Sequence, residues 1–308
     1  MSIAFLFPGQ GSQAPGMLHA LPDHPAITRT LNEASEYLKT DIRELDSKEA
    51  LQSSVSVQLA LLACGVSMAR ALIEEGIEPE AVAGLSVGAF AAATLCGVIS
   101  LSDAVRLVRQ RAEMMVHLYP TGYGLAAIVG LSEKQVAKLV DEAYADRAPV
   151  YVGNINAPRQ IVIAGSGEGI RKVLEAARKN GARKAEELHV AVPSHCPLLE
   201  PVADALRERL GKMNLQSPNY VYVGNVNART LRTSDAIAED LASNVAHGVR
   251  WYDSVTVLDE MGCHLFLEMP PGHVLTQLAT ESVPSVQTLA LGEVSLKHAL
   301  HVAARYSN

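Results

Sequence analysis

Basic charge is scarce in this chain of 308 residues. Lys and Arg number 26 against 33 Asp and Glu, which leaves a net charge of -7 at neutral pH. Nucleic-acid binding depends on a basic stripe that neutralises phosphates, and no segment of the sequence supplies one. We therefore expect no nucleic-acid partner, and an anionic substrate would need a local basic group of its own.

Cysteine is also rare. The sequence has four cysteines, and no two of them share a C-x-x-C spacing. This pattern indicates neither a disulfide framework nor a zinc site. We expect a protein of the reducing cytoplasm, with no metal and no redox cofactor.

Long apolar runs are missing too. The longest, residues 55–73, is interrupted by Gln58, Ser67 and Arg70, which favours a core helix over a membrane span. Only five apolar residues follow one another at 3–7, with no basic residue before them, so we expect neither a signal peptide nor a membrane location. Hydrophobic residues still make up 48% of the chain, which predicts a folded protein of about two domains.

Short apolar strands alternate with long helical patterns in the first part of the chain. Strands are predicted at 3–7 and 82–84, and helices at 55–75, 89–96 and about 103–118. This alternation is typical of a parallel sheet. We therefore expect a large α/β-hydrolase-like domain.

The pattern changes between residues 122 and 190. Its order there is strand, helix, strand, strand, helix, strand, which is the ferredoxin-like motif. We predict an inserted small ferredoxin-like α+β subdomain at 122–190. The large α/β domain would then consist of residues 1–121 and 191–308.

Gly84-Leu85-Ser86-Val87-Gly88 is a G-x-S-x-G motif between a predicted strand and a predicted helix, the context of a nucleophile elbow. The glycines allow the sharp turn that exposes the serine hydroxyl, and the helix N-terminus offers N–H groups to a developing oxyanion. The alternative is an ordinary strand-to-helix loop. We predict that Ser86 is an acyl-carrying nucleophile.

A serine nucleophile needs a base, and histidine has a suitable pKa. Of the ten histidines, His195 follows a strand-like stretch and comes after Ser86 in the chain, as in α/β hydrolases. It is our candidate base, with a structural histidine as the alternative. We interpret the neighbouring Cys196 as a small buried hydrophobe rather than a nucleophile.

Arg111 is the basic group that helical geometry singles out. Its neighbours three and four positions away are all apolar: Leu107, Val108, Met114 and Met115. Arg106 and Arg109 instead have polar neighbours and are predicted on the solvated face. A buried arginine is costly unless an anion pairs with it, and its planar fork suits a carboxylate. The alternative is a structural pair with an Asp or Glu elsewhere.

These features occur together with further motifs in one order along the chain. The set consists of Phe7-Pro8-Gly9-Gln10-Gly11-Ser12-Gln13, the elbow at Ser86, Arg111, Asn154-Ile155-Asn156-Ala157-Pro158, Gln160-Ile161-Val162-Ile163-Ala164-Gly165 and Val192-Pro193-Ser194-His195-Cys196. Together they resemble malonyl-CoA:acyl carrier protein transacylases over nearly the whole chain.

The resemblance implies a role for each matching position. Ser86 would be the nucleophile, His195 the base and Arg111 the group that holds the malonyl carboxylate. Backbone N–H groups of Gln10 and Val87 would form the oxyanion hole. The resemblance also places Gln58 and Asn156 in the substrate pocket, and it assigns the main-chain carbonyl of Arg250 to the orientation of His195. The partners it implies are malonyl-CoA and an acyl carrier protein with a phosphopantetheine-type arm.

Three departures from the family pattern point to a particular branch. The elbow has Leu85 and Ala89 where the family has His and Glu, a late loop reads Pro270-Pro271-Gly272, and the small subdomain opens with Tyr119-Pro120-Thr121-Gly122-Tyr123-Gly124. These variants resemble the epsilon subunit of bacterial malonate decarboxylase. We therefore predict transfer to the carrier subunit of that complex, whose arm derives from dephospho-CoA, with other decarboxylase subunits as possible partners.

Other functions remain open at this point. A malonyl-CoA:acyl carrier protein transacylase of fatty acid or polyketide synthesis would use the same residues. A serine thioesterase or esterase would share the elbow and the histidine but pass the acyl group to water. A binding subunit without activity would keep only the fold.

Overall fold

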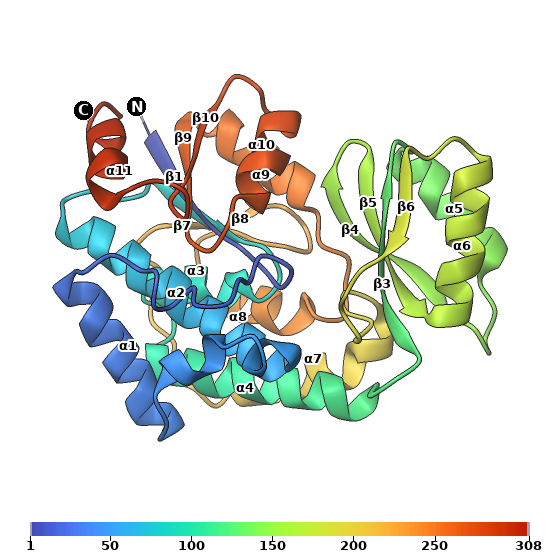
Figure 1. The fold of residues 1–308 in the computed structure, drawn as a ribbon, viewed down its shortest axis with the longest axis horizontal. Helices are drawn as coiled ribbons and strands as arrows, with labels where there is room; N and C mark the ends of the chain where they lie inside the picture. The colour runs from blue at the N-terminus through green and yellow to red at the C-terminus, as the bar shows by residue number, and fades with distance from the viewer. Residues whose placement is uncertain (1, 307–308) are drawn as a thin grey trace.

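The computed structural model describes residues 2–306, and its centre is a six-stranded sheet (Figure 1). The strand order is β10-β9-β1-β2-β7-β8, and all neighbours are parallel except β7 and β8. Its strands are β1 (Ser2–Phe7), β2 (Ala81–Gly84), β7 (Val221–Val223), β8 (Thr230–Leu231), β9 (Cys263–Glu268) and β10 (Gln287–Ala290). The strands β1 and β2 are apolar and buried because helices cover the sheet, as parallel sheets require.

Helices surround this sheet. They are α1 (Pro25–Leu38), α2 (Ser54–Glu74), α3 (Gly88–Leu95), α4 (Leu101–Leu118), α7 (Glu200–Leu210), α8 (Ser234–Ser243), α9 (Trp251–Glu260), α10 (Val274–Ser282) and α11 (Leu296–Ala303), with short 3-10 turns η1 (Ile42–Asp46), η2 (Ala50–Gln52) and η3 (Pro197–Leu199). The predicted helices at 55–75, 89–96 and 103–118 correspond to α2, α3 and α4. The helix α4 begins where the Ser100 hydroxyl accepts a hydrogen bond from the Asp103 N–H.

The helix α2 is long and apolar enough to cross a membrane by length and composition. However, 83% of its most apolar window is buried inside the fold, where it packs against α1, α3 and α4. An apolar surface on all sides is also what a central core helix needs. The prediction of a core helix at this position is therefore confirmed.

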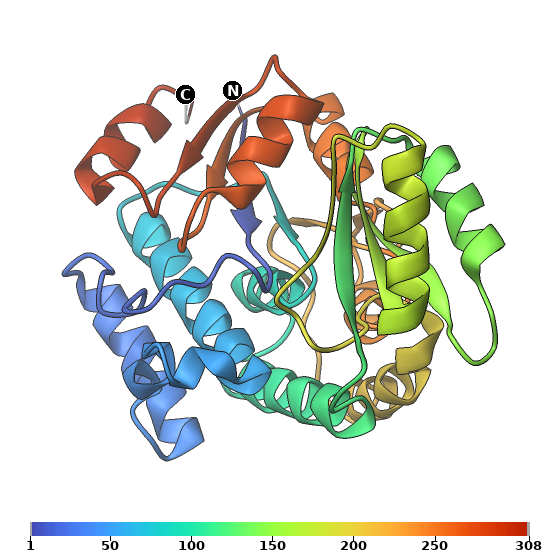
Figure 2. The ribbon, with the colours of Figure 1, turned by 45° about the vertical axis from the view of Figure 1, so that its right-hand side comes forward.

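Residues 122–190, which we call the small lobe, carry a second sheet of four antiparallel strands in the order β4-β5-β3-β6. Its elements are β3 (Tyr123–Val129), α5 (Glu133–Ala143), β4 (Val150–Ala157), β5 (Gln160–Ser166), α6 (Gly167–Lys179) and β6 (Lys184–Glu187). In two views of the molecule, α5 and α6 cover the outer face of this sheet (Figures 1 and 2). The fold class, a parallel-rich α/β sheet with a separate antiparallel sheet, is confirmed, and the division into two domains stays an interpretation.

Strand pairing brings three distant loops to one edge of the central sheet. Phe7 at the end of β1 pairs with Gly84 at the end of β2, and Ala83 pairs with Val223 at the end of β7. Because these strands are parallel, the segments that follow them all leave at the same edge. The 8–13 loop, the elbow and the segment after β7 therefore meet there.

Candidate active site

The elbow at Ser86 has the strained backbone of a nucleophile turn. Ser86 has a φ of 57°, in the left-handed region that a serine rarely occupies. The turn is tight: a Cβ on Gly88 would lie 2.2 Å from the carbonyl oxygen of Phe7. Glycine is therefore required at this position, and the turn presents the Ser86 hydroxyl to the cavity that Gln10, Arg111 and His195 also line.

The loop after β1 packs backbone to backbone against the elbow. A Cβ on Gly9 would lie 2.6 Å from the carbonyl oxygen of Leu85, so only glycine allows this approach. Among residues 2–306, the backbone N–H groups of Gln10 and Val87 have no hydrogen-bond partner. The two N–H groups come from the two loops that flank the Ser86 hydroxyl, which is the arrangement an oxyanion hole needs.

His195 meets the serine directly. Its Nε2 lies 2.8 Å from Ser86 Oγ, and its Nδ1 lies 2.5 Å from the backbone carbonyl oxygen of Asn244. A carbonyl can only accept, so Nδ1 carries the proton and Nε2 is left with its lone pair toward the serine. The residue was expected on sequence grounds, and the structure brings it to Ser86 across 109 positions.

The predicted orienting carbonyl of Arg250 is wrong, because Asn244 occupies that position. The Arg250 carbonyl instead accepts the Ser254 N–H at the start of α9, and the Nδ1 of His195 bonds to the Asn244 carbonyl. Asn244 instead caps the C-terminus of α8, where the last carbonyls of a helix have no partner within the helix. The negative end of the helix dipole also favours a positive charge on His195, which replaces part of what a triad acid would do.

Burial and, to a smaller extent, the positive charge of Arg111 together lower the pKa of His195 to about 3. The imidazole is 3% exposed and is therefore neutral at physiological pH. A neutral imidazole is the form that can accept a proton. His195 therefore needs no prior change in charge to accept a proton.

Arg111 is buried on the apolar face of α4, as predicted, with 1% of its surface exposed. Its Nη2 donates to Ser86 Oγ over 3.1 Å and its Nη1 to Gln58 Oε1 over 2.5 Å, while Nε has no partner. No acid in the described part of the chain forms an ion pair with it, so the alternative of a structural pair is not observed. Burial lowers the pKa of Arg111 to about 10, which leaves the guanidinium charged at neutral pH. A buried, unpaired cation beside the serine is suited to an anionic substrate.

The hydrogen bond that Arg111 donates also fixes the direction of the Ser86 hydroxyl hydrogen. Guanidinium groups cannot accept, so Ser86 Oγ accepts from Arg111 and must direct its own hydrogen to His195 Nε2. The three side chains therefore form one continuous chain of hydrogen bonds from Gln58 to the Asn244 carbonyl.

Gln58 and Asn156, the two other residues predicted in the substrate pocket, lie in different places relative to the cavity. Gln58 is buried on α2 and accepts a hydrogen bond from Arg111, so its contact with the site is made through the guanidinium group. Asn156 is also buried, but the cavity at Ser86 is lined by Asn154, two residues earlier on β4. The substrate-binding role of Asn156 stays a prediction.

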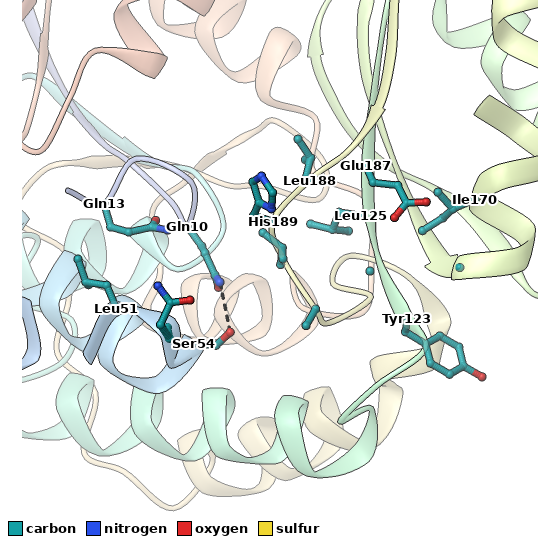
Figure 3. Close-up of a pocket in the computed structure, with 15 residues that line it drawn as sticks. Gln10, Gln13, Leu51, Ser54, Tyr123, Leu125, Ile170, Glu187, Leu188 and His189 are labelled. Carbon is teal, nitrogen blue, oxygen red and sulfur yellow. Dashed lines mark hydrogen bonds between the residues drawn. The ribbon is translucent and has the colours of Figure 1, made fainter. Parts of the chain in front are cut away.

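The cavity at Ser86 measures about 50 Å³ and lies beside a larger cleft of about 390 Å³. Gln10, Leu125 and Val190 line both spaces, so the two are adjacent. Figure 3 shows Gln13, Leu51 and Ser54 on one side of the cleft and Tyr123, Ile170 and Glu187 of the small lobe on the other. An acyl group attached to a long polar arm could therefore reach Ser86 between the two parts of the protein.

The cysteines offer no competing nucleophile. All four are buried and unpaired, and burial raises the pKa of Cys196 to about 12. A thiol with this pKa is protonated at neutral pH, and the thiolate is the reactive form. Within residues 2–306, no group of three His, Cys, Asp or Glu side chains could hold a metal ion.

An acyltransferase is the class of enzyme that this fold and this site indicate. Residues 4–301 match the model of the acyl transferase domain, so the chain belongs to that family. The malonyl CoA-acyl carrier protein transacylase of Escherichia coli (strain K12) is 38% identical over 298 residues, which are 95% of this chain and 96% of that protein.

Solved structures agree with this assignment. The malonyl CoA-acyl carrier protein transacylase of Coxiella burnetii has a TM-score of 0.95 at 31% identity, covering 100% of this chain and 98% of that one. A malonyl-transacylase in complex with its type II PKS acyl-carrier protein has a TM-score of 0.93 at 34% identity, with both chains covered in full.

Proposed function

We propose that this acyltransferase moves a malonyl group from malonyl-CoA, through an ester on Ser86, to the thiol of an acyl carrier protein. The observation that carries this proposal is Arg111, a buried cation without an acidic partner that donates a hydrogen bond to Ser86 Oγ. The free carboxylate of a malonyl group would supply the missing anion at bidentate geometry. An acetyl group would leave the cation unpaired.

The first half of the reaction forms the ester. Ser86 Oγ attacks the thioester carbonyl of malonyl-CoA while its proton passes to His195 Nε2. The N–H groups of Gln10 and Val87 bind the oxyanion of the tetrahedral intermediate. The carbon–sulfur bond then breaks, and His195 returns the proton to the departing CoA thiolate.

The second half reverses these roles. The thiol of the carrier gives its proton to His195 Nε2, and its sulfur attacks the ester carbonyl. When the carbon–oxygen bond breaks, Ser86 Oγ takes the proton back from His195. Each half returns the histidine to its neutral state, so the cycle is a ping-pong transfer that needs no other cofactor.

We propose a carrier of fatty acid or polyketide synthesis as the acceptor. The Escherichia coli relative is named as a malonyl CoA-acyl carrier protein transacylase, and one solved relative is in complex with a type II PKS acyl-carrier protein. None of the relatives named above is called a subunit of malonate decarboxylase. The decarboxylase carrier stays a prediction, based on Leu85, Ala89 and Pro270-Pro271-Gly272. A cytoplasmic location also stays a prediction, with which four free thiols agree.

A side-by-side transfer assay tests the acceptor. The purified enzyme is loaded with malonyl-CoA and offered equal concentrations of a fatty acid synthesis carrier and a malonate decarboxylase carrier. We expect faster malonylation of the first carrier. Preference for the second would reverse the proposal on the pathway and leave the chemistry at Ser86 intact.

The lifetime of the acyl-enzyme tests transfer against hydrolysis. In the absence of a carrier, a transferase should hold the malonyl ester long enough for its detection by intact-protein mass. A serine thioesterase would release malonate quickly under the same conditions. Failure of the protein to react with malonyl-CoA at all would instead favour a binding subunit without activity.

A further inference from the structure

The strained conformation of Ser86 depends on contacts that come from outside the elbow. A non-glycine residue in the left-handed region persists only where its surroundings hold it there. The contact that holds Ser86 comes from Asn225, which follows β7 at the same edge of the sheet and is 2% exposed.

Asn225 joins both sides of the turn with one side chain. Its Oδ1 accepts the N–H of Ser86 over 2.9 Å, and its Nδ2 donates to the carbonyl of Gly84 over 2.9 Å. A residue at this position must therefore offer one acceptor and one donor at fixed places. Loss of either contact would leave a buried backbone group of the elbow without a partner.

Asn225 is in turn held by Asp240 on α8. Asp240 Oδ1 accepts the backbone N–H groups of Asn225 and Val226 over 2.8 and 3.1 Å, and its Oδ2 accepts the Tyr222 hydroxyl over 3.0 Å. The carboxylate thus binds the segment after β7 through Oδ1 and β7 itself through Oδ2. This fixes the backbone from which the Asn225 side chain extends.

The same turn of α8 also holds the base. The N–H of Asn244 donates to the carbonyl of Asp240 over 3.0 Å, and the carbonyl of Asn244 accepts His195 Nδ1. In addition, the backbone N–H of His195 donates to the Val245 carbonyl over 2.7 Å. One end of α8 therefore connects to the nucleophile through Asn225 and to the base through its terminal carbonyl.

We propose that Asn225 and Asp240 are positioning residues that fix the Ser86 hydroxyl relative to His195. The inference rests on the proposed function, because it concerns the rate at which Ser86 takes up the acyl group. Neither residue lines the cavity, so neither should contribute to the binding of malonyl-CoA. A misplacement of about 1 Å can lower a rate about a hundredfold.

Two variants of Asn225 test this role. Asn225→Ala removes both contacts and should lower the single-turnover acylation rate about a hundredfold. Asn225→Asp keeps the size of the side chain; its ionised carboxylate can accept from Ser86 but repels the Gly84 carbonyl. A protonated carboxyl has both a donor and an acceptor, so the rate of Asn225→Asp should rise as the pH falls from about 8 to about 5. The wild-type rate should not rise over this range, because the low pKa of His195 keeps the base neutral.

Binding and folding are measured separately. Calorimetry with malonyl-CoA on Ser86→Ala, with and without Asn225→Ala, should give dissociation constants within about twofold of each other. Ser254→Ala is the matched control, because this buried α9 hydroxyl lies within hydrogen-bond distance of the carbonyls of Gly224, just after β7, and Arg250, and not of Ser86. It should acylate at the wild-type rate.

The outcomes separate this inference from the proposed function. Reaction with a fluorophosphonate probe reports on Ser86 without any malonyl group. If the wild type reacts with the probe but forms no malonyl ester, the proposed function fails and the probe still tests positioning. Wild-type probe rates in both Asn225 variants would overturn the positioning role. A fall in probe rate no larger than the fraction of unfolded protein, measured by thermal melting, would overturn it as well. If Asn225→Ala does not fold, the pH profile of Asn225→Asp decides alone.

Discussion

Two arginines of this protein lie in opposite environments. Arg207 on α7 is 42% exposed and binds three carboxylate oxygens, two from Glu239 on α8 and one from Asp204. These hydrogen bonds and charges raise the pKa of Arg207 above its ordinary value. Arg111 on α4 is buried without any acid, and burial lowers its pKa to about 10.

This difference in burial and acidic partners indicates which arginine to examine for a functional role. A surface pair is screened by water and contributes about 0–1 kcal/mol, even with good geometry. A buried cation without an anion lowers the stability of the folded protein, so the stability of the fold does not explain why an arginine is buried there. Under the proposed function, the anion of a substrate supplies that explanation for Arg111, and nothing comparable is needed for Arg207.

The largest effect should follow from the loss of the oxygen that Arg111 and His195 share. Ser86→Ala removes the acceptor of the Arg111 bond and the hydroxyl that bonds to His195 Nε2. We expect malonyl transfer to fall by about 10⁴-fold or more, and no covalent adduct by intact-protein mass. An adduct on this variant would identify another nucleophile, with Cys196 as the first residue to examine.

Arg111→Met should separate activity from stability. The transfer rate with malonyl-CoA should fall about a hundredfold, because the carboxylate would enter a buried site without its partner. The preference for malonyl-CoA over acetyl-CoA should disappear. The melting temperature should stay equal or rise, because the variant removes an unpaired buried charge and keeps the volume filled. A large fall in melting temperature with an unchanged donor preference would make Arg111 a structural residue.

The sequence predicted the parts of the site that depend on local patterns. The G-x-S-x-G motif located Ser86 because the turn needs glycines within five residues, and the helical period located Arg111 because apolar neighbours surround it. These patterns also placed the ends of α2 and α4 within about two residues.

The parts that depend on long-range contacts could not be predicted in this way. Asn225 meets Ser86 across 139 positions, and its only signal is a polar residue just after a buried strand of the same sheet. The Asn244 contact uses a backbone carbonyl, which every residue has, so no side chain marks it. The choice of Arg250 came from a family position, and it failed because that carbonyl is used by α9.

The pH dependence of acylation tests a further difference between Arg111 and Arg207, because the charge of Arg111 lowers the pKa of His195. A histidine with an ordinary pKa would lose about 25-fold in its neutral fraction between pH 7 and pH 5. Since the pKa of His195 is lowered to about 3, the acylation rate of the wild type should change by less than about twofold over this range.

The same measurement on Arg111→Met isolates the effect of the charge. Removal of the positive group should raise the pKa of His195, so the acid limb of the reaction with a fluorophosphonate probe should move to higher pH. Gln58→Leu, which keeps the charge and removes the Nη1 partner, is the control for altered packing. An acid limb at the same pH in all three proteins would show that burial alone sets this pKa.

The smallest effect should come from the other arginine. Arg207→Ala removes hydrogen bonds to Glu239 and Asp204, both of which are about half-exposed or more. We expect the free energy of unfolding to fall by at most about 1 kcal/mol, and this loss should shrink at high salt, which screens exposed charges. Malonyl transfer should stay at the wild-type rate, because α8 keeps its contacts to Asn225 and His195 through Asp240 and Asn244. Chemical denaturation at low and high salt, with a transfer assay on the same samples, measures both. A loss of activity without a loss of stability would show that the α7–α8 surface communicates with the active site.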